Sequence, residues 1–182
     1  MTRPVKRKAR MERTNAAMVL FLDFDGVLHP ESEDTELFCR TPRLWRILRT
    51  CPHVSVVFST AWREMYPMKE LVRLATEDGG EDLKRRFVGV TPQIDPYSIS
   101  EDLCWRETEC LTWLTQSGNL ETPWLALDDL DYLFSPSCPN LHLTDFNHGL
   151  TDADVRRVIS RLTVGAAQAN AVRNLTSLSQ RL

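Results

Sequence analysis

Short runs of consecutive apolar residues recur along the chain, and several of them are followed by acidic or hydroxyl side chains. Runs of this kind are typical of strands that are buried on both faces of a parallel sheet. The pattern predicts five strands, at Met18–Leu22, Val54–Phe58, Phe87–Val90, Trp124–Leu127 and Asn140–Leu143. Segments with helical periodicity lie between them, so we expect a doubly wound α/β fold.

Helices are predicted where apolar residues recur every three or four positions between the strands. Thr41 is expected to be the N-cap of the first, because Pro42 then occupies the first helical position. Thr151 and Asp154 have the spacing of a capping box that opens the last helix. The expected helices begin at Thr41, span about Met68–Thr76, span Ser100–Leu114, and run from Thr151 to Leu162.

Length and composition limit the class of protein. A chain of 182 residues allows one well-buried α/β domain but not two comfortable ones. Hydrophobic and charged fractions of 42% and 26% are typical of a soluble globular protein, and no apolar run is long enough to cross a bilayer. The amino terminus lacks the apolar core of a secretory signal, and the five cysteines form no CxxC pair. We therefore expect a cytoplasmic protein with reduced thiols, without membrane contact, disulfide framework or zinc site.

Positive charge is concentrated at the amino terminus. The first thirteen residues carry a net charge of +5, which leaves −8 for the rest of a chain of net charge −3. We expect residues 1–17 to form a disordered basic arm, residues 18–163 the folded domain and residues 164–182 a tail of uncertain order. The arm is either a non-specific clamp on nucleic-acid phosphates or a solubilising tail, unless Met11 or Met18 is the true start.

The first predicted strand leads directly into acidic residues. Asp23 follows Leu22, and Asp25 and Gly26 come next. Open α/β sheets bind ligands at the carboxyl ends of their strands, and a glycine can adopt the positive φ that turns the chain away from such an edge. The two carboxylates are therefore expected to be presented at a ligand site, with solvated or helix-capping acids as the alternative.

The segment Asp23-Phe24-Asp25-Gly26-Val27 resembles motif I of the haloacid dehalogenase-like (HAD) superfamily. The resemblance implies a three-layer Rossmann-like domain in which Asp23 attacks phosphorus and becomes an aspartyl-phosphate. It also implies that Asp25 is the general acid and then the general base, and that a Mg²⁺ keeps the attacking carboxylate ionised. His29 is interpreted as a loop histidine, with contact to a leaving group as the alternative.

Other strand ends carry residues that resemble the remaining HAD motifs. Ser59 and Thr60 follow the second strand, and Ser59 is the preferred candidate for the hydroxyl of motif II, which orients a phosphoryl oxygen. Asp128 and Asp129 follow the fourth strand and match the acidic motif IV. Each pair also has a plain structural interpretation, since hydroxyl and acidic residues often cap helices and turns.

The resemblance implies that Mg²⁺ is held by Asp23, by the backbone carbonyl of Asp25 and by motif IV. Asp128 is favoured as the direct ligand, with Asp129 as a second ligand or an outer contact. Mg²⁺ takes oxygen ligands and needs only one or two carboxylates. Two acidic strand ends in one sheet would repel each other without a cation between them, which favours the metal over a capping role.

A basic residue is required to neutralise the nucleophile and the phosphoryl group in this family. Arg106 is the best-placed candidate for this motif III, and Lys84 is the rival. The run Lys84–Arg86 nevertheless resembles a solvated approach to a strand. Arg63 is expected to reach a substrate phosphate from the rim of the site, or to form a surface ion pair.

Six segments resemble a narrower group, the HAD domains associated with Swiss-army-knife RNA-repair proteins. They are Leu22–Leu28, Phe58–Arg63, Val90–Pro92, Arg106-Glu107 with Trp113-Leu114, Leu127–Asp129 and Gly149–Thr151. No full cap domain fits between the motifs, so the resemblance implies an open site and a bulky or polymeric phosphomonoester, such as a nucleic-acid end. The alternatives are a small-metabolite phosphatase, a phosphotransferase and a non-catalytic phosphate-binding module, and the oligomeric state stays open.

Overall fold

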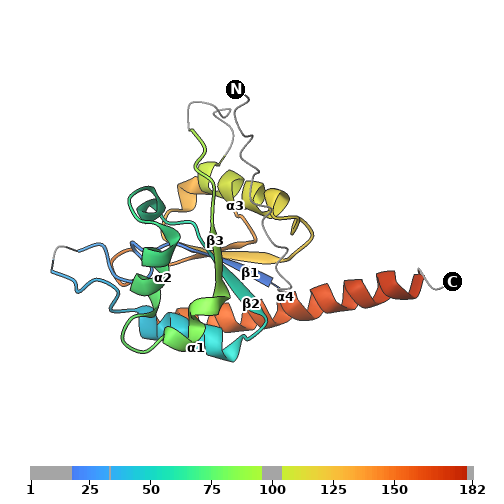
Figure 1. Ribbon diagram of the computed structural model, residues 1–182, viewed down its shortest axis with the longest axis horizontal. Helices are drawn as coiled ribbons and strands as arrows, with labels where there is room; N and C mark the ends of the chain where they lie inside the picture. The colour runs from blue at the N-terminus through green and yellow to red at the C-terminus, as the bar shows by residue number, and fades with distance from the viewer. Residues whose placement is uncertain (1–17, 33, 96–103, 180–182) are drawn as a thin grey trace, which may run out of the picture.

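The computed structural model, which describes residues 18–32, 34–95 and 104–179, contains one sheet of five parallel strands between two layers of helices (Figure 1). The strands are β1 (Met18–Leu22), β2 (Val54–Phe58), β3 (Phe87–Val90), β4 (Trp124–Asp128) and β5 (Leu141–Leu143). Their order is β3-β2-β1-β4-β5, and every neighbouring pair is parallel. The predicted Rossmann-like α/β fold is confirmed, and no cap domain is evident in the described residues.

The helices cover both faces of the sheet. The α-helices are α1 (Thr41–Thr50), α2 (Met68–Thr76), α3 (Trp105–Gln116) and α4 (Asp152–Ser179), and the short 3-10 helices are η1 (Ala61–Glu64), η2 (Glu81–Arg86) and η4 (Asp131–Leu133). One buried cluster joins the sheet to α1, α2 and α4, and a second joins it to α3. Figure 1 shows α3 above the sheet and α1 and α4 below it.

Alternation along β1 decides which face carries the chemistry. Leu20 and Leu22 belong to the cluster with α1, α2 and α4, whereas Val19 and Phe21 belong to the cluster with α3. Phe21 packs edge-on against Trp113 of α3, with 6.0 Å between ring centroids. Because side chains alternate along a strand, Asp23 shares the face of Phe21. A basic residue from α3 is therefore positioned to meet it.

Helix boundaries differ from the predictions at three places. Thr41 lies inside α1, where its hydroxyl donates to the carbonyl of Phe38 at 2.9 Å, and the N-cap is Arg40, without a side-chain cap. The predicted start at Ser100 lies outside the described residues, and α3 begins at Trp105. The predicted end of the last helix at Leu162 is too early, since α4 continues to Ser179.

The capping box that opens α4 is confirmed. The N–H of Thr151 donates to Asp154 Oδ2 at 2.9 Å, and the N–H of Asp154 donates to Thr151 Oγ1 at 3.3 Å. Figure 1 shows the second half of α4 extending away from the sheet. The basic arm, residues 1–17, lies outside the described residues. Among those described, no helix is long and apolar enough to cross a membrane.

Arg86 anchors the start of β2 and does not belong to a solvated run. Its Nε donates to the carbonyl of Val54 at 2.7 Å, while Nη1 and Nη2 donate to the carbonyls of Leu48 and Cys51 at 3.1 and 2.7 Å. Leu48 lies near the end of α1, where carbonyls lack partners within the helix. One guanidinium thus satisfies the backbone that joins α1 to β2.

Replacing Arg86 with alanine should leave these carbonyls without their donor. We expect Arg86→Ala to lower the free energy of unfolding by about 2–3 kcal/mol, since several charge-assisted hydrogen bonds are lost together. Arg85→Ala is the matched control, because Arg85 is exposed. Urea unfolding at neutral pH measures both. Equal losses in the two variants would contradict the anchoring role of Arg86.

Candidate active site

The candidate site lies at the carboxyl ends of three neighbouring strands. The N–H of Asp23 donates to the carbonyl of Leu127 at 3.1 Å, which extends the pairing of β1 with β4. The N–H of Ser59 donates to the carbonyl of Leu22 at 2.9 Å, which extends the pairing of β1 with β2. Asp23 therefore lies between the end of β2, with Ser59, and the end of β4, with Asp128.

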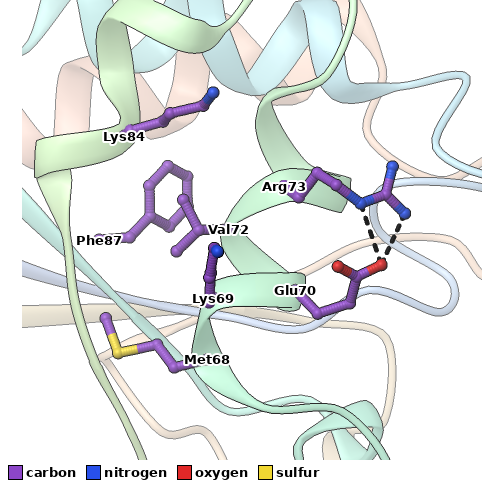
Figure 2. Close-up of a pocket in the computed structure, with 7 residues that line it drawn as sticks. All are labelled: Met68, Lys69, Glu70, Val72, Arg73, Lys84 and Phe87. Atoms are coloured by element: carbon purple, nitrogen blue, oxygen red, sulfur yellow. Dashed lines mark hydrogen bonds and ion pairs between the residues drawn. The ribbon is translucent and has the colours of Figure 1, made fainter.

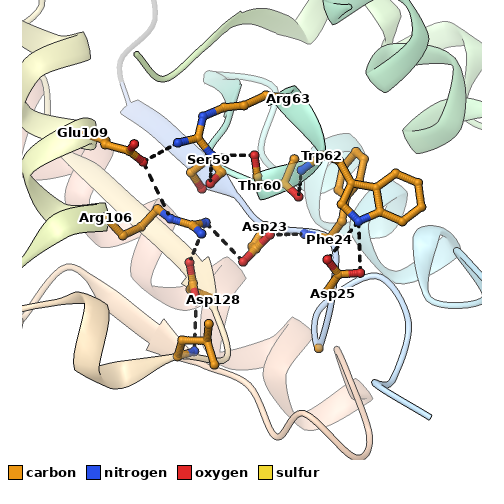
Figure 3. A network of polar contacts seen from close by, with 12 residues as sticks. Asp23, Phe24, Asp25, Ser59, Thr60, Trp62, Arg63, Arg106, Glu109 and Asp128 are labelled. Carbon is orange, nitrogen blue, oxygen red and sulfur yellow. Dashed lines mark hydrogen bonds and ion pairs between the residues drawn. The ribbon is translucent and has the colours of Figure 1, made fainter. Parts of the chain in front are cut away.

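Asp23 contacts a backbone donor and a guanidinium (Figure 3), and a hydrogen bond with the Thr60 side chain also lowers its pKa. Its Oδ1 accepts from the N–H of Phe24 at 2.7 Å, and its Oδ2 lies 3.2 Å from Nη1 of Arg106. The residue is only 4% exposed. Burial raises the pKa of Asp23 by more than Arg106 and the Phe24 N–H lower it, so the net shift is upward.

Arg106 comes from the first turn of α3 and bridges two strand ends. Nη1 lies 3.2 Å from Asp23 Oδ2 and 3.2 Å from Asp128 Oδ2, and all three side chains are buried. Arg106, the preferred candidate for motif III, thus contacts both acidic strand ends. Burial lowers the pKa of Arg106, but the charges of the two aspartates outweigh it and raise the pKa, so this side chain stays charged.

Lys84, the rival candidate, lies elsewhere. It belongs to η2, which precedes the amino end of β3, whereas the acids lie at carboxyl ends. Lys84 lines a groove of about 600 Å³ together with Met68, Val72 and Phe87. Figure 2 shows these side chains. Since parallel strands place their amino and carboxyl ends at opposite edges of a sheet, Lys84 does not face the acidic cluster.

Three carboxylates form a compact cluster that a metal ion fits. One oxygen each from Asp23, Asp128 and Asp129 lies within 4.8 Å of the other two. Asp129 Oδ2 is buried and has no hydrogen-bond partner among the described residues. Burial and then the charge of Asp23 raise the pKa of Asp128 well above its usual value and that of Asp129 to about 6. A hard divalent cation would add positive charge to that of Arg106 and would supply a partner for the free oxygen of Asp129.

The turn after β2 carries two hydroxyls, and they differ in their hydrogen bonding. Ser59 Oγ is buried and finds no hydrogen-bond partner in the part of the chain that the structure describes. Thr60 Oγ1 accepts from the N–H of Trp62 at 3.3 Å and so caps η1. Of the two predicted hydroxyls, that of Ser59 therefore has its hydrogen-bonding capacity available for a ligand.

Arg63 lies in the interior instead of at the rim. Its side chain is 4% exposed, and Nη2 lies 2.6 Å from Oε2 of Glu109, which is 1% exposed. Nη1 donates to the carbonyls of Ser59 and Thr60 at 3.0 and 2.6 Å (Figure 3). Neither the expected rim position nor a surface ion pair describes this arrangement. The guanidinium ties the turn after β2 to α3.

Asp25 directs its carboxylate toward aromatic residues and away from the acidic cluster. Trp62 Nε1 donates to Oδ2 at 2.9 Å and to Oδ1 at 3.1 Å, and His29 Nε2 lies 3.0 Å from Oδ1. Burial raises the pKa of Asp25, but the hydrogen bonds from His29 and Trp62 outweigh it and lower the pKa. The side chain of Asp25 is 37% exposed, so solvent or a ligand can reach it.

Comparison with protein-family models matches residues 19–155 to the family described as the HAD domain in Swiss Army Knife RNA repair proteins. The chain belongs to this family. The match contains every residue of the site described above. Searches of curated proteins and of solved structures found no match. Membership of the HAD family implies phosphohydrolase chemistry, and the acidic cluster is a possible metal site of the kind that such chemistry uses.

Glu109 and Trp62 of this HAD site have no role in the sequence-based prediction, and His29 is interpreted there as a loop histidine. Glu109 pairs with Arg63, and Trp62 and His29 hold Asp25. Glu109 lies three positions after Arg106, so the helical spacing on α3 would have placed both side chains on one face. Trp62 offers no such signal, because its contact with Asp25 spans 37 positions of the chain.

Gly26 offers a test of how closely the site is packed. A Cβ at this position would lie 2.3 Å from the carboxyl carbon of Asp129, and the φ of Gly26 is +60°. We expect Gly26→Ala to lower the free energy of unfolding by about 2 kcal/mol and to weaken binding of a divalent cation, because Asp129 must move. Urea unfolding and titration with Mg²⁺ measure the two effects.

Gly165→Ala is the control for this substitution. Gly165 lies in α4, and its Cβ would meet the flexible end of the Met18 side chain, 2.9 Å from Sδ. Alanine is favoured over glycine in a helix by about 1 kcal/mol, which offsets that contact. Unfolding free energies that fall equally in both variants would refute the packing constraint at Gly26.

Proposed function

We propose that this HAD domain is a Mg²⁺-dependent phosphatase that hydrolyses phosphomonoesters through an aspartyl-phosphate on Asp23. The observation that carries the proposal is the placement of a buried carboxylate between an arginine, a free hydroxyl and two further acids. Arg106 and the Phe24 N–H hold the Asp23 carboxylate in one orientation, as a nucleophile requires. Ser59 Oγ has donor capacity for a phosphoryl oxygen.

The reaction has two displacement steps in this proposal. Asp23 attacks phosphorus, the bond to the ester oxygen breaks, and Asp25 gives its proton to that oxygen. Asp25 then takes a proton from the attacking water, and the bond between phosphorus and Asp23 breaks to release phosphate. Arg106 balances negative charge on Asp23 and on the phosphoryl group.

Two further groups complete the proposed chemistry. Asp23, Asp128 and Asp129 would hold the Mg²⁺, which supplies charge neutralisation for the phosphoryl oxygens when it is bound. The pKa of Asp25 is lowered in the free protein, so its pKa has to rise when the substrate binds if Asp25 is to donate a proton. A phosphate dianion beside Asp25 raises the pKa of that carboxyl group, because like charges disfavour ionisation.

The substrate class is inferred from the openness of the site. No cap covers the carboxyl edge of the sheet among the described residues, so a bulky or polymeric ester can approach it. The family name refers to RNA repair proteins, which favours a phosphorylated nucleic-acid end as the substrate. Phosphate release from nucleotides, sugar phosphates and RNA or DNA with 3′- or 5′-phosphates discriminates this class from small metabolites.

Labelling of the protein tests the nucleophile. We expect wild-type protein, quenched in acid during turnover of a radiolabelled phosphomonoester, to retain labelled phosphate, and Asp23→Asn to retain none. Turnover by Asp23→Asn should fall at least about a thousandfold, because the covalent route is lost. Asp25→Ala should retain more label than the wild type with a good leaving group, since dephosphorylation lacks its base. Normal turnover by Asp23→Asn would refute the mechanism.

Metal-dependent stability tests the acidic cluster. Mg²⁺ at about a hundred times its Kd should raise the melting temperature of the wild type by about 5 °C, because it binds only the folded state. Asp129→Asn should raise the melting temperature without metal, since it removes one of three mutually repelling charges, and should abolish the shift with Mg²⁺. Asp131→Asn, at an exposed position of η4, is the control. An unchanged Mg²⁺ shift in Asp129→Asn would remove Asp129 from the metal site.

A further inference from the structure

The indole of Trp62 shares its N–H between the two oxygens of Asp25, at 2.9 Å from Oδ2 and 3.1 Å from Oδ1 (Figure 3). A donor shared in this way fixes the orientation of the carboxylate as well as its position. We propose that Trp62 is a positioning residue that holds Asp25 for proton transfer at the leaving group. This inference rests on the proposed function, in which Asp25 is the general acid and base.

The indole of Trp62 cannot turn away from Asp25 without disturbing an aromatic cluster. Its ring stacks on Tyr66 with 5.5 Å between centroids and an interplanar angle of 28°. The rings of Phe24 and Phe38 meet it edge-on at 5.8 and 5.4 Å. Contacts on several sides hold the ring in one orientation, so the Nε1 donor is preorganised toward Asp25.

His29 supplies a second donor and determines which oxygen of Asp25 stays available. His29 Nδ1 accepts from the N–H of Phe38 at 3.4 Å, so Nε2 carries the proton of the neutral ring and donates to Asp25 Oδ1. Oδ1 thus has two donors, Trp62 and His29, whereas Oδ2 has Trp62 alone. Since the side chain of Asp25 is 37% exposed, Oδ2 is the oxygen that can exchange a proton with a ligand.

The same turn of chain orients both the phosphoryl group and the acid. Trp62 follows Ser59 by three residues, and its N–H donates to Thr60 Oγ1 at 3.3 Å. Arg63 fixes the carbonyls of Ser59 and Thr60 and pairs with Glu109 of α3. Placement of the free hydroxyl and of the indole donor therefore depends on one anchored turn, which sets the distance between the phosphoryl site and Asp25.

Dependence of the rate on the leaving group separates positioning from general damage to the site. The full-length protein with Mg²⁺ is assayed on phenyl, nitrophenyl and dinitrophenyl phosphate, which differ mainly in how much their leaving oxygens need a proton. Trp62→Phe keeps an aromatic ring and removes the donor. We expect kcat/KM to fall about tenfold on phenyl phosphate, whose phenol has a pKa of about 10, and less than about twofold on dinitrophenyl phosphate.

Trp45→Phe is the matched control, because Trp45 also donates its indole N–H, to the carbonyl of Ala75 at 2.8 Å, but lies away from the site. It should leave the leaving-group dependence unchanged. In the double variant Asp25→Ala/Trp62→Phe, loss of the indole should add nothing to the loss of the acid. A melting curve checks each fold, and Trp62→Leu, which also lacks the donor, replaces Trp62→Phe if that variant does not fold.

Two different failures are distinguishable in this experiment. If Asp25→Ala lowers kcat/KM equally on all three esters, Asp25 is not the general acid, and the proposed mechanism fails. If Asp25→Ala is selective for the poor leaving group, but removal of the Trp62 donor lowers all three rates equally or none, the mechanism stands and the positioning role of Trp62 is overturned.

Discussion

Two buried aspartates at the carboxyl edge of the sheet, Asp23 and Asp128, share one arginine, and this shared ion pair constrains the rest of the structure. The side chains of Asp23 and Asp128 are 6% and 0% exposed, so each loses most of its hydration. Removing an ion from water costs several kcal/mol unless it is paired. Arg106 belongs to α3 and contacts both aspartates. Helix α3 therefore has to pack on the face of the sheet on which the Asp23 side chain lies. The contact of Phe21 with Trp113 provides that packing.

One face of α3 contacts groups on both sides of Asp23. Arg106 reaches the ends of β1 and β4, and Glu109, one helical turn later, reaches Arg63 beside the end of β2. Arg106 Nε also lies 3.8 Å from Glu109 Oε2, so the two ion pairs are joined. A small shift of α3 would disturb the acidic cluster and the turn after β2 together. These ion pairs leave the carboxylate of Asp129 without a partner for its Oδ2 among the described residues, so a divalent cation fits there.

Much of the fold could be predicted because it depends on local patterns. Strands that are buried on both faces appear as continuous apolar runs, and β1 and β2 begin and end where the runs do. The acids and hydroxyls that end these strands could likewise be assigned to one edge of the sheet. The extension of α4 beyond Leu162 could not be predicted, because that segment has no clear apolar stripe of helical periodicity.

Residues that orient the site were harder to predict, because they act over long separations in sequence. Arg63 and Glu109 are 46 positions apart, and no local sequence pattern pairs them. Arg63 was expected at the rim because a charged residue in a loop is usually exposed. Burial becomes favourable only when Glu109 and two backbone carbonyls receive the guanidinium, and all three partners depend on the tertiary fold.

The loop between β1 and α1 shows how this HAD domain builds the side of its site around Asp25. Phe38 has a φ of 61°, a conformation that costs a non-glycine residue of order 1–2 kcal/mol. In this conformation its N–H meets His29 Nδ1, its carbonyl accepts from Thr41, and its ring packs on Trp62. These contacts hold the strained residue in place, and two of them, with His29 and Trp62, support the groups that contact Asp25. No cap is evident in the described residues to give such support, so the strain at Phe38 is part of what holds Asp25 in position.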